Sequence, residues 1–418
     1  AAEGLAEPRP RSGFYVQKTY GMLHTRTPRP APQAVVPAAP KPVGEPATLF
    51  DLSTGSVDTA LFPARSWGRI QKELLYQRPE LLQRGEMQGD APLRTQIAEY
   101  LSVYRGVECT PEQIVVGAGI EYLLGCLAHL FSDGMAAIEN PGYFRTRTVL
   151  QNSGIPCTLV DIDREGLPAD ALEKSGANLC YLTPSHHFPT GVTMPATRRA
   201  QLLAWAAARP GRYILEDDYD SEFRFDTRPL PSLQGMAGPD GPVVYLTTFS
   251  KSLAPGIRIA YMVLPRQLLG AWQAKYRLYS GTVGRFEQQT LARFITGGYF
   301  TRHLARERTA YKARRDALVA ALRTSFAPEE LTLAGLHTGL HLLAQLKDPP
   351  PDAALRAAAR QYGVRCSLLS DYDLTGTAHS AAGTLVLGYG SLPDADCAAA
   401  GERLKKLCTA AREASDTV

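Results

Sequence analysis

Apolar segments that favour β-strands alternate with segments of helical periodicity through the middle of this chain, from about residue 90 to residue 290. One apolar run, at 114–119, ends in glycines that lead directly into a predicted helix at 120–131. Because strands that are separated by helices usually pair in parallel, this alternation predicts a mostly parallel sheet with helices on both faces. The further strand segments of this region are 135–139, 178–183, 213–217, 243–246 and 259–264.

The composition is that of an ordinary folded protein and sets few limits on its partners. The 418 residues, 44% of them hydrophobic and 21% charged, are enough for two or more domains. The net charge of +4 argues by itself for neither a nucleic acid nor a membrane partner. The seven cysteines form no C-x-x-C pair, which is typical of reduced thiols, and no apolar run approaches the roughly 18 residues of a membrane span. We therefore expect a cytoplasmic protein.

The first 48 residues differ in character from the rest of the chain. A short basic turn leads into the apolar segment 13–16, and nothing before it is expected to pair with that strand. This pattern predicts a severed hairpin, and the alternative is a disordered tail. Residues 26–48 are rich in proline and alanine, a composition that favours extended polyproline conformations. We interpret them as a semi-rigid linker to a main body that starts near residue 49.

From residue 284 onward the chain is expected to become mainly helical and then mixed. Helices are predicted at 284–295 and 299–322, and basic side chains gather on the second one. Because Glu307 and Asp316 are interleaved with them, we interpret this surface as a solvated face or a dimer rim rather than a nucleic-acid site. Residues 330–410 combine short strands with helices, which predicts a smaller α+β domain.

A lysine stands in a loop between two of the predicted strands, within residues 247–258. Thr248 and Ser250 place short hydroxyl donors beside Lys251. Further along the loop, Arg258 adds a forked cationic donor that suits phosphate oxygens. A lysine amine condenses with an aldehyde to form a Schiff base. Pyridoxal 5′-phosphate (PLP) carries both an aldehyde and a phosphate, so this loop suggests a PLP site rather than a solvated turn.

Other strand ends carry side chains that suit a cofactor, since ligands of α/β proteins bind where strands end. Gly119 opens a helix whose free N–H groups attract an anion. Tyr143 and Arg145 follow a Pro-Gly turn, where the tyrosine is able to stack on a flat ring and the arginine to hold a carboxylate. The run 216–222 ends a strand in carboxylates that need partners when buried, and an aspartate beside a protonated pyridine nitrogen would have one.

Two features would suit a metal ion, but we predict no metal. His186 and His187 are adjacent and therefore point in different directions, and no cysteine or carboxylate stands at ligand spacing from them. The acidic run 216–222 would suit a divalent metal, whereas the lysine–arginine loop that follows it does not.

Taken in order, these motifs resemble those of fold type I PLP enzymes, the aminotransferase superfamily. They are more closely similar to the MocR/GabR type of bacterial transcription regulators in the GntR superfamily. The resemblance covers roughly residues 9–410, and residues 9–16 are similar to the tail of a winged helix-turn-helix wing. It implies an α/β fold, aminotransferase-like, in which a mostly parallel seven-stranded sheet domain is joined to a smaller α+β domain. It rests on the segments 89–94, 183–191, 216–223 and 248–255.

The same resemblance implies a division of the chain. Residues 1–25 would be the remnant of the wing, and residues 26–48 the linker rich in proline and alanine. The large PLP-binding domain would span 89–296, and the smaller domain would combine 49–88 with 297–418.

The resemblance also implies roles for single residues. Lys251 would carry the Schiff base of PLP, Asp217 would pair with the pyridine nitrogen, and Tyr219 would pair with the ring hydroxyl. Tyr143 would stack on the ring, and Arg145 would meet the acid group of an amine ligand. The phosphate would be held by Thr248, Ser250, Arg258 and the amides of Gly119, Ile120 and Glu121.

Three positions depart from the aminotransferase pattern. Phe188 stands where these enzymes have the asparagine of Asn-Pro-Thr-Gly, so one partner of the ring hydroxyl is missing. Ile120 brings no hydroxyl to the phosphate turn. Val386 stands where many of these enzymes carry the arginine that binds the substrate carboxylate, which disfavours turnover of ordinary α-amino acids.

We therefore interpret the chain as the PLP-binding, effector-sensing domain of such a regulator, which binds an amine or amino-acid-like effector as an external aldimine at Lys251. We expect a homodimer, and contact with DNA through a winged helix-turn-helix domain that this chain lacks. The alternatives are a catalytically active PLP-dependent aminotransferase, in which Lys251 also transfers protons, and a scaffold that has lost the cofactor. The set of Lys251, Asp217 and Tyr219 argues against the scaffold, and the wing remnant together with Val386 favours a sensor over an enzyme.

Overall fold

The computed structural model describes residues 6–10, 12–16, 49–131, 133–226, 230–376 and 382–416. The chain forms two compact units, Ala1–Glu45 and Pro46–Val418, and each is described by itself. The predicted linker, residues 26–48, lies outside the described residues, and so do residues 17–25 of the predicted wing remnant.

The first unit contains a β-hairpin. β1 (Ala6–Arg9) pairs antiparallel with β2 (Gly13–Val16). The expectation that nothing before β2 pairs with it is therefore wrong. β1 contains Pro8 and lacks an apolar alternation, which weakens its strand signal in the sequence. A strand at a sheet edge nevertheless accepts a proline, because its outward side needs no hydrogen-bond donor.

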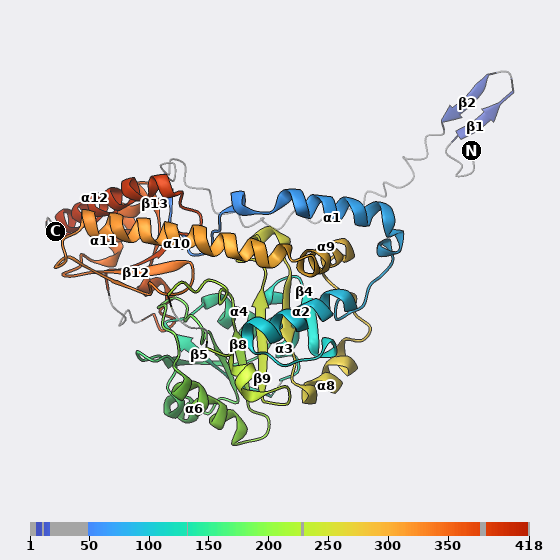
Figure 1. Ribbon diagram of the computed structural model, residues 1–418, viewed down its shortest axis with the longest axis horizontal. Helices are drawn as coiled ribbons and strands as arrows, with labels where there is room; N and C mark the ends of the chain where they lie inside the picture. Colours follow the sequence, from blue (N-terminus) through green and yellow to red (C-terminus); the bar gives the residue numbers. More distant parts are fainter. Residues whose placement is uncertain are drawn as a thin grey trace, which may run out of the picture. The chain divides into compact units, whose positions relative to one another are not determined.

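A seven-stranded sheet forms the centre of the second unit (Figure 1). Neighbouring strands are parallel except at β10, which is antiparallel to both β4 and β9. The predicted mostly parallel sheet is thereby confirmed. In order across the sheet, the strands are β4 (Ile114–Gly117), β10 (Ala260–Val263), β9 (Val243–Thr248), β8 (Tyr213–Asp217), β7 (Leu179–Leu182), β5 (Ala136–Asn140) and β6 (Cys157–Asp161).

Helices cover both faces of this sheet, because successive residues of a strand point to opposite sides. In β4, Val116 packs into one apolar cluster with Leu93 of α2. Its neighbour Val115 packs into another cluster with Leu123 of α3. The helices of this region are α2 (Ala91–Arg105), α3 (Ile120–Ala128), α4 (Phe144–Asn152), α5 (Ala169–Lys174), α6 (Ala196–Ala207), α7 (Leu233–Ala237), α8 (Arg266–Tyr276) and α9 (Arg285–Thr296).

A smaller antiparallel sheet follows in the chain, with the order β11-β12-β15-β14. The long helix α10 (Tyr299–Ser325) packs along α12 at this sheet and also contacts α9 beside the larger one (Figure 1). Leu342, Leu318 and Leu404 belong to the buried core between this sheet and its helices. Its elements are β11 (Leu331–Ala334), β12 (His341–Leu346), α11 (Asp352–Gln361), β14 (Ser367–Leu368), β15 (Thr384–Gly388) and α12 (Cys397–Asp416).

The segment that opens the second unit contacts the cores of both sheets. β3 (Phe50–Asp51) pairs parallel with β13 (Val364–Arg365). α1 (Ala64–Gln77) instead buries Trp67, Ile70 and Leu74 in the cluster that contains α2 and α9. α1 thus packs with the helices of the larger sheet, although its residues fall in the stretch assigned to the smaller domain from the sequence.

Some smaller features complete the second unit. All of the cysteines are free, as their scattered positions led us to expect. Among the described residues, no helix has the length and apolar character needed to cross a membrane. Short 3₁₀ helices span Thr59–Leu61, Pro79–Leu82, Pro111–Gln113, Pro255–Ile257, Leu369–Tyr372 and Asp394–Asp396.

Candidate functional site

A cavity of about 380 Å³ lies where several strands of the larger sheet end. Residues that follow β4, β5, β8 and β9 line it, because the carboxyl ends of parallel strands meet at one edge of a sheet. The structure brings together here all of the residues that were predicted to bind the cofactor or the effector. They are Gly119, Ile120, Glu121, Tyr143, Arg145, Asp217, Tyr219, Thr248, Ser250, Lys251 and Arg258.

Residues that the sequence analysis did not single out complete the wall. Thr54 and Gly55 follow β3, while Leu340 and His341 stand at the start of β12 in the smaller sheet. Asp220, a member of the acidic run 216–222, also lines the cavity. Parts of the chain that precede and follow the larger sheet in sequence therefore close the cavity. The motifs at the strand ends of that sheet do not predict this contribution.

The Lys251 side chain is half-buried in this cavity. Its Nζ donates a hydrogen bond to the backbone oxygen of Thr54 at 2.6 Å. Burial lowers the pKa of the Lys251 ammonium group to about 8, and the nearby Asp220 carboxylate opposes this shift. The neutral amine, which is the form that condenses with aldehydes, is therefore more accessible than in an exposed lysine.

Asp217 ends β8 with one carboxylate oxygen bonded and the other one unpartnered. Oδ2 accepts a hydrogen bond from the Tyr181 hydroxyl, and the buried Oδ1 has no partner among the described residues. Burial raises the pKa of Asp217 to about 7, although the Tyr181 hydrogen bond opposes that rise. A buried carboxylate oxygen without a donor is destabilising, so this position fits a ligand that supplies an N–H group, such as a protonated pyridine nitrogen.

The residues at the start of α3 fit a phosphate group. Gly119 has a φ of 100° and precedes the first N–H groups of the helix, whose positive end attracts an anion. A Cβ at this position would stand 2.3 Å from Nη2 of Arg258, so glycine is needed for the arginine to lie here. In the same cavity, the hydroxyls of Thr248 and Ser250 lie 2.8 Å apart. Hydroxyls, a guanidinium group and free amides together form a donor set that suits phosphate oxygens.

Arg145 reaches the cavity from the start of α4 and forms an ion pair with Glu121 there. Its Nη1 lies 3.2 Å from Oε1 of Glu121, whose Oε2 lies 3.4 Å from Nη2 of Arg258. The Arg145 side chain is 58% exposed. The predicted acid-binding residue thus stands at the rim and shares Glu121 with the predicted phosphate-binding arginine.

Phe188 packs among aromatic side chains at the cavity wall. Its ring meets those of Tyr143 and Tyr219 edge-on, with centroid distances of 5.5 and 6.2 Å. It also packs against a buried apolar cluster that contains Val386. That cluster consists of Leu343, Leu369, Tyr372 and Val386.

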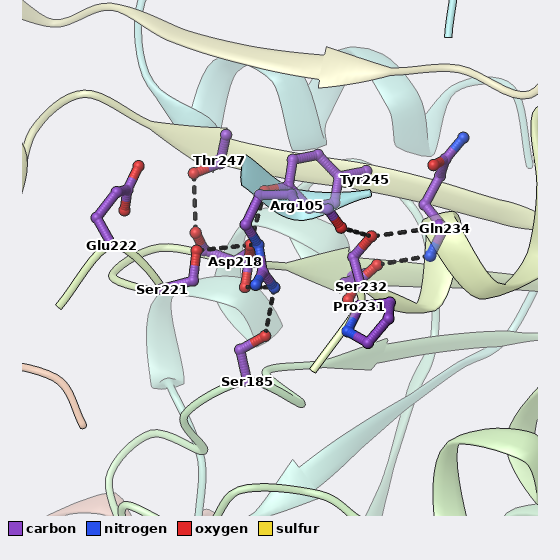
Figure 2. Close-up of polar contacts among 12 residues, drawn as sticks. Arg105, Ser185, Asp218, Ser221, Glu222, Pro231, Ser232, Gln234, Tyr245 and Thr247 are labelled. Carbon is purple, nitrogen blue, oxygen red and sulfur yellow. Dashed lines mark hydrogen bonds and ion pairs between the residues drawn. The ribbon is translucent and has the colours of Figure 1, made fainter. Parts of the chain in front are cut away.

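A buried polar network holds the acidic segment that follows β8 (Figure 2). Arg105 contacts Asp218 twice, with Nε 2.7 Å from Oδ2 and Nη2 3.1 Å from Oδ1. The hydroxyls of Tyr245 and Ser221 also donate to Oδ2, and Arg105 donates to Ser185 as well. The network around Asp218 thereby connects α2, β9 and the loop after β7. The neighbours of Asp218 in the chain, Asp217 and Tyr219, both line the cavity.

Asp220 makes a contact with His186 that the sequence analysis missed. Its Oδ2 lies 2.8 Å from Nδ1 of His186, and the His341 ring centroid lies 4.6 Å from that of His186. The three residues offer ligand atoms within 4.8 Å of one another, so the statement that no carboxylate accompanies the histidine pair is corrected. The carboxylate comes from a different strand end, which sequence spacing does not show. We interpret the His186–Asp220 contact as a hydrogen bond because of its length.

Both the sequence and the fold have known relatives. The family described as aminotransferase class I and II matches residues 47–375. The uncharacterized HTH-type transcriptional regulator YhdI of Bacillus subtilis (strain 168) is 35% identical over 406 residues, which cover 97% of this chain and 84% of that protein. The probable rhizopine catabolism regulatory protein MocR of Rhizobium meliloti is 35% identical over 323 residues, with coverages of 76% and 64%. The solved structure of LysN, the α-aminoadipate aminotransferase of Thermus thermophilus complexed with N-(5′-phosphopyridoxyl)-L-leucine, is 26% identical, with a TM-score of 0.75 and coverages of 87% and 93%.

Proposed function

This chain belongs to the aminotransferase class I and II family and to the MocR/GabR type of transcription regulators, and from that membership we propose that it senses a primary amine through PLP held at Lys251. The observation that carries the proposal is the buried Oδ1 of Asp217, which has no partner among the described residues and lies in the same cavity as the Lys251 amine. The cavity thus offers one partner to each reactive part of PLP: Asp217 to the ring nitrogen, Lys251 to the aldehyde, and the donors around Arg258 to the phosphate.

When PLP is bound, it supplies an aldehyde that links to amines and a ring that withdraws electrons from them. Lys251 would hold this group until an effector arrives, and Asp217 would keep its ring nitrogen protonated. Tyr143 would stack on the ring, and Tyr219 would bond to the ring hydroxyl oxygen. The phosphate would be bound by Thr248, Ser250, Arg258 and the amides of Gly119, Ile120 and Glu121.

The effector would be an amine whose acid group, if it has one, lies away from the amine-bearing carbon. Arg145 is the cation proposed to meet that acid group, and it has to release Glu121 to do so. Val386, at the position where many aminotransferases carry the carboxylate-binding arginine, is an uncharged side chain buried among apolar neighbours. An ordinary α-amino acid therefore lacks an anchor that would hold it for turnover, which favours sensing over transamination.

Other parts of the proposal concern the whole regulator. The hairpin of β1 and β2 would be the end of a DNA-binding wing, because the relatives are HTH-type regulators. Such a regulator would act on DNA in the cytoplasm and as a homodimer. An effector would then change the affinity for DNA only as far as it binds one arrangement of the protein more tightly than another.

A visible spectrum of the purified protein, titrated with amines, amino acids and amino sulfonates, tests this function. We expect a yellow protein whose band shifts when the effector is added and then persists, with little conversion of an added keto acid. A protein that stays colourless after incubation with PLP would contradict cofactor binding. Rapid multiple turnover with a keto acid acceptor would instead favour the aminotransferase alternative.

A further inference from the structure

The outward face of α1 carries a stripe of basic side chains. Arg65, Arg69 and Lys72 recur at intervals of four and three residues, and all of them are exposed. Residues with this spacing lie on one side of a helix, and the opposite side of α1 is buried through Trp67 and Ile70. At about 1.5 Å per residue, the three cations extend over roughly 10 Å. The stripe therefore faces solvent along about two turns of the helix.

The start of α10 extends this stripe (Figure 1). Nη2 of Arg69 donates a hydrogen bond to the hydroxyl of Tyr299, and the guanidinium carbon of Arg69 lies 5.6 Å from the centroid of that ring. Arg302 lies over the same ring, with its guanidinium carbon 4.8 Å from the centroid, and the exposed Arg306 follows one turn later on α10. The two helices thus form one basic surface, which consists of Arg65, Arg69, Lys72, Arg302 and Arg306.

Few carboxylates offset the charge of this basic surface. Among the described residues, Glu73 is the acidic side chain that pairs with it. Its Oε1 lies 3.9 Å from Nε of Arg69, and its Oε2 lies 4.0 Å from Nη1 of Arg293 on α9. The other four cations of the surface form no ion pair with a described residue. Because exposed ion pairs contribute little free energy, Arg69 remains available to an anionic partner.

The acidic residues that the sequence interleaves with the basic residues of α10 do not neutralise this face. Glu307 is only 1% exposed, and its Oε1 lies 3.3 Å from Nε2 of the equally buried His303. Asp316 pairs with its neighbour Arg315 and lies roughly three turns beyond Arg306. The interleaving therefore does not argue against a nucleic-acid partner at the start of the helix.

We propose that the basic surface binds the phosphate backbone of duplex DNA, an inference that rests on the proposed function of the chain as part of a DNA-bound regulator. Arginine and lysine side chains clustered along a helix are the electrostatic signature of a nucleic-acid surface, and the relatives are HTH-type regulators. One strand of B-DNA carries a phosphate about every 3.4 Å along the axis. The roughly 10 Å of the α1 stripe therefore matches about three phosphates.

These contacts are expected to be independent of the base sequence. α1 packs against α9 in one apolar cluster and meets α10 at Tyr299, so it does not project from the protein as a helix that enters the major groove does. Phosphate contacts fix the position of a protein on a duplex but carry no sequence information. The basic surface would thus hold DNA, while base recognition would belong to the proposed winged helix-turn-helix domain.

Fluorescence anisotropy of a labelled duplex of arbitrary sequence, titrated with this chain, tests the proposal. We expect binding that weakens steeply between about 50 and 200 mM salt, because DNA releases counterions when cations bind its phosphates. Arg65→Gln/Arg69→Gln/Lys72→Gln should bind at least about tenfold more weakly at the lower salt concentration, and its slope of log K against log salt should be shallower by up to about 3. For Arg302→Gln/Arg306→Gln, the slope should be shallower by up to about 2.

The matched control removes the same charge elsewhere. Arg323, Arg360 and Lys406 are exposed and lie on α10, α11 and α12. Their triple replacement by glutamine should bind the duplex with nearly the affinity of the wild type. Thermal unfolding followed by circular dichroism verifies that each variant is folded. If the α1 variant does not fold, the comparison of Arg302→Gln/Arg306→Gln with a double control, Arg323→Gln/Arg360→Gln, decides.

Several outcomes would overturn the proposal. They are a wild type that does not bind the duplex at about 50 mM salt, and a control that loses as much affinity as the α1 variant, because net charge alone would then explain binding. Tighter binding to phosphatidylserine vesicles than to DNA would show that the partner is a membrane.

The amine titration of the PLP band separates this inference from the proposed sensing function. The substituted residues lie outside the cavity, so the band should respond to amines as in the wild type. A chain that responds to amines but does not bind DNA would refute only the basic surface. A colourless chain that binds DNA through this surface would refute only the PLP site.

Discussion

The pKa values of Lys251 and Asp217 are both shifted toward the neutral form of the side chain. Burial lowers the pKa of the lysine to about 8 and raises that of the aspartate to about 7. Both shifts disfavour the charged form, because the cavity withdraws these groups from water and supplies few partners. The site without cofactor is therefore preorganised for a ligand at a cost in stability.

We expect the amine of Lys251 in the cofactor-free protein to reach its half-maximal acylation rate near pH 8. The folded-state pKa of about 8 lies below the ordinary value of 10.5, so the folded protein binds fewer protons than the unfolded chain between these values. The destabilisation by this group is complete below pH 8 and is relieved as the pH rises toward 10.5. Mass spectrometry of pulse-labelled protein measures the rate, with the exposed Lys72 as internal reference. A midpoint above pH 10 would contradict the lowered pKa.

Asp217→Asn should stabilise the cofactor-free protein at pH 8 and change little at pH 4. The pKa of Asp217 rises from 3.8 to about 7 on folding, so its destabilising effect grows as the pH rises through this window and is complete above pH 7. The asparagine keeps an oxygen for the Tyr181 hydroxyl but carries no charge. We expect a gain of about 1–3 kcal/mol in the free energy of unfolding at pH 8. Urea denaturation at both pH values measures it, and the same variant should bind PLP less tightly.

Arg145→Ala should weaken the spectral response to an acid-bearing amine by roughly 10- to 150-fold, the range that corresponds to the loss of about 1.5–3 kcal/mol for a charge-assisted contact. The PLP band itself should stay. Glu121→Gln is the matched variant, because it removes the carboxylate that competes for Arg145. It should strengthen the response to the same amine. If Arg145→Ala binds the amine as well as the wild type does, another cation must hold the acid group.

At the scale of the elements, the contact between Arg105 and Asp218 joins α2 to the segment after β8 (Figure 2). The two side chains are almost fully buried, at 5% and 0% exposure. Burial acts to raise the pKa of Asp218, but Arg105 and the surrounding hydroxyls hold it at about 2. This carboxylate therefore contributes stability above its ordinary pKa of 3.8, and the contribution is lost as the pH falls toward 2.

Arg105→Met should lower the free energy of unfolding by about 3–5 kcal/mol at pH 7, because it leaves Asp218 charged and buried without its cation. The double variant Arg105→Met/Asp218→Leu should recover part of this loss, since both charges are then removed. Thermal and urea unfolding of the single and double variants measure the difference. A double variant that is less stable than Arg105→Met would show that the hydroxyl network, rather than the ion pair, dominates.

At the scale of the whole molecule, large apolar side chains stand exposed on one region of the second unit. Tyr76, Leu82 and Leu278 are 77%, 77% and 80% exposed. Nη2 of Arg84 donates to the backbone oxygen of Leu278 at 3.2 Å, which brings the loop after α8 beside the segment of Leu82. Apolar surface of this kind marks an interface, and we assign it to the proposed homodimer.

We expect the wild type to sediment as a dimer of the 45.4 kDa chain, and Leu82→Asp together with Leu278→Asp to shift it toward the monomer at micromolar concentration. Burying two carboxylates in an apolar contact is unfavourable. Leu49→Asp is the control, because Leu49 is also exposed, at 58%, but lies at the start of the second unit. A wild type that sediments only as a monomer would contradict the dimer.

The sequence by itself determined the larger sheet and the side chains at its strand ends. The alternation of apolar and helical segments favours parallel strands, and parallel strands end at one edge of the sheet. Gly119, Tyr143, Asp217 and Lys251 each follow or end such a strand. They therefore lie close together at this edge of the sheet, whatever the conformation of the connecting loops. β1 was not predicted, because an edge strand that contains a proline has no periodic apolar pattern.

Only the tertiary structure decided which of these side chains are partners. Lys251 donates a hydrogen bond to Thr54, and Arg145 forms an ion pair with Glu121. Asp220 contacts His186, whose ring lies beside that of His341 from the other sheet. Each contact joins segments that follow different strands or belong to different sheets, so no spacing along the chain encodes it. These contacts arise because the packing of the two sheets places the loops within hydrogen-bond range and removes the water that would otherwise satisfy them.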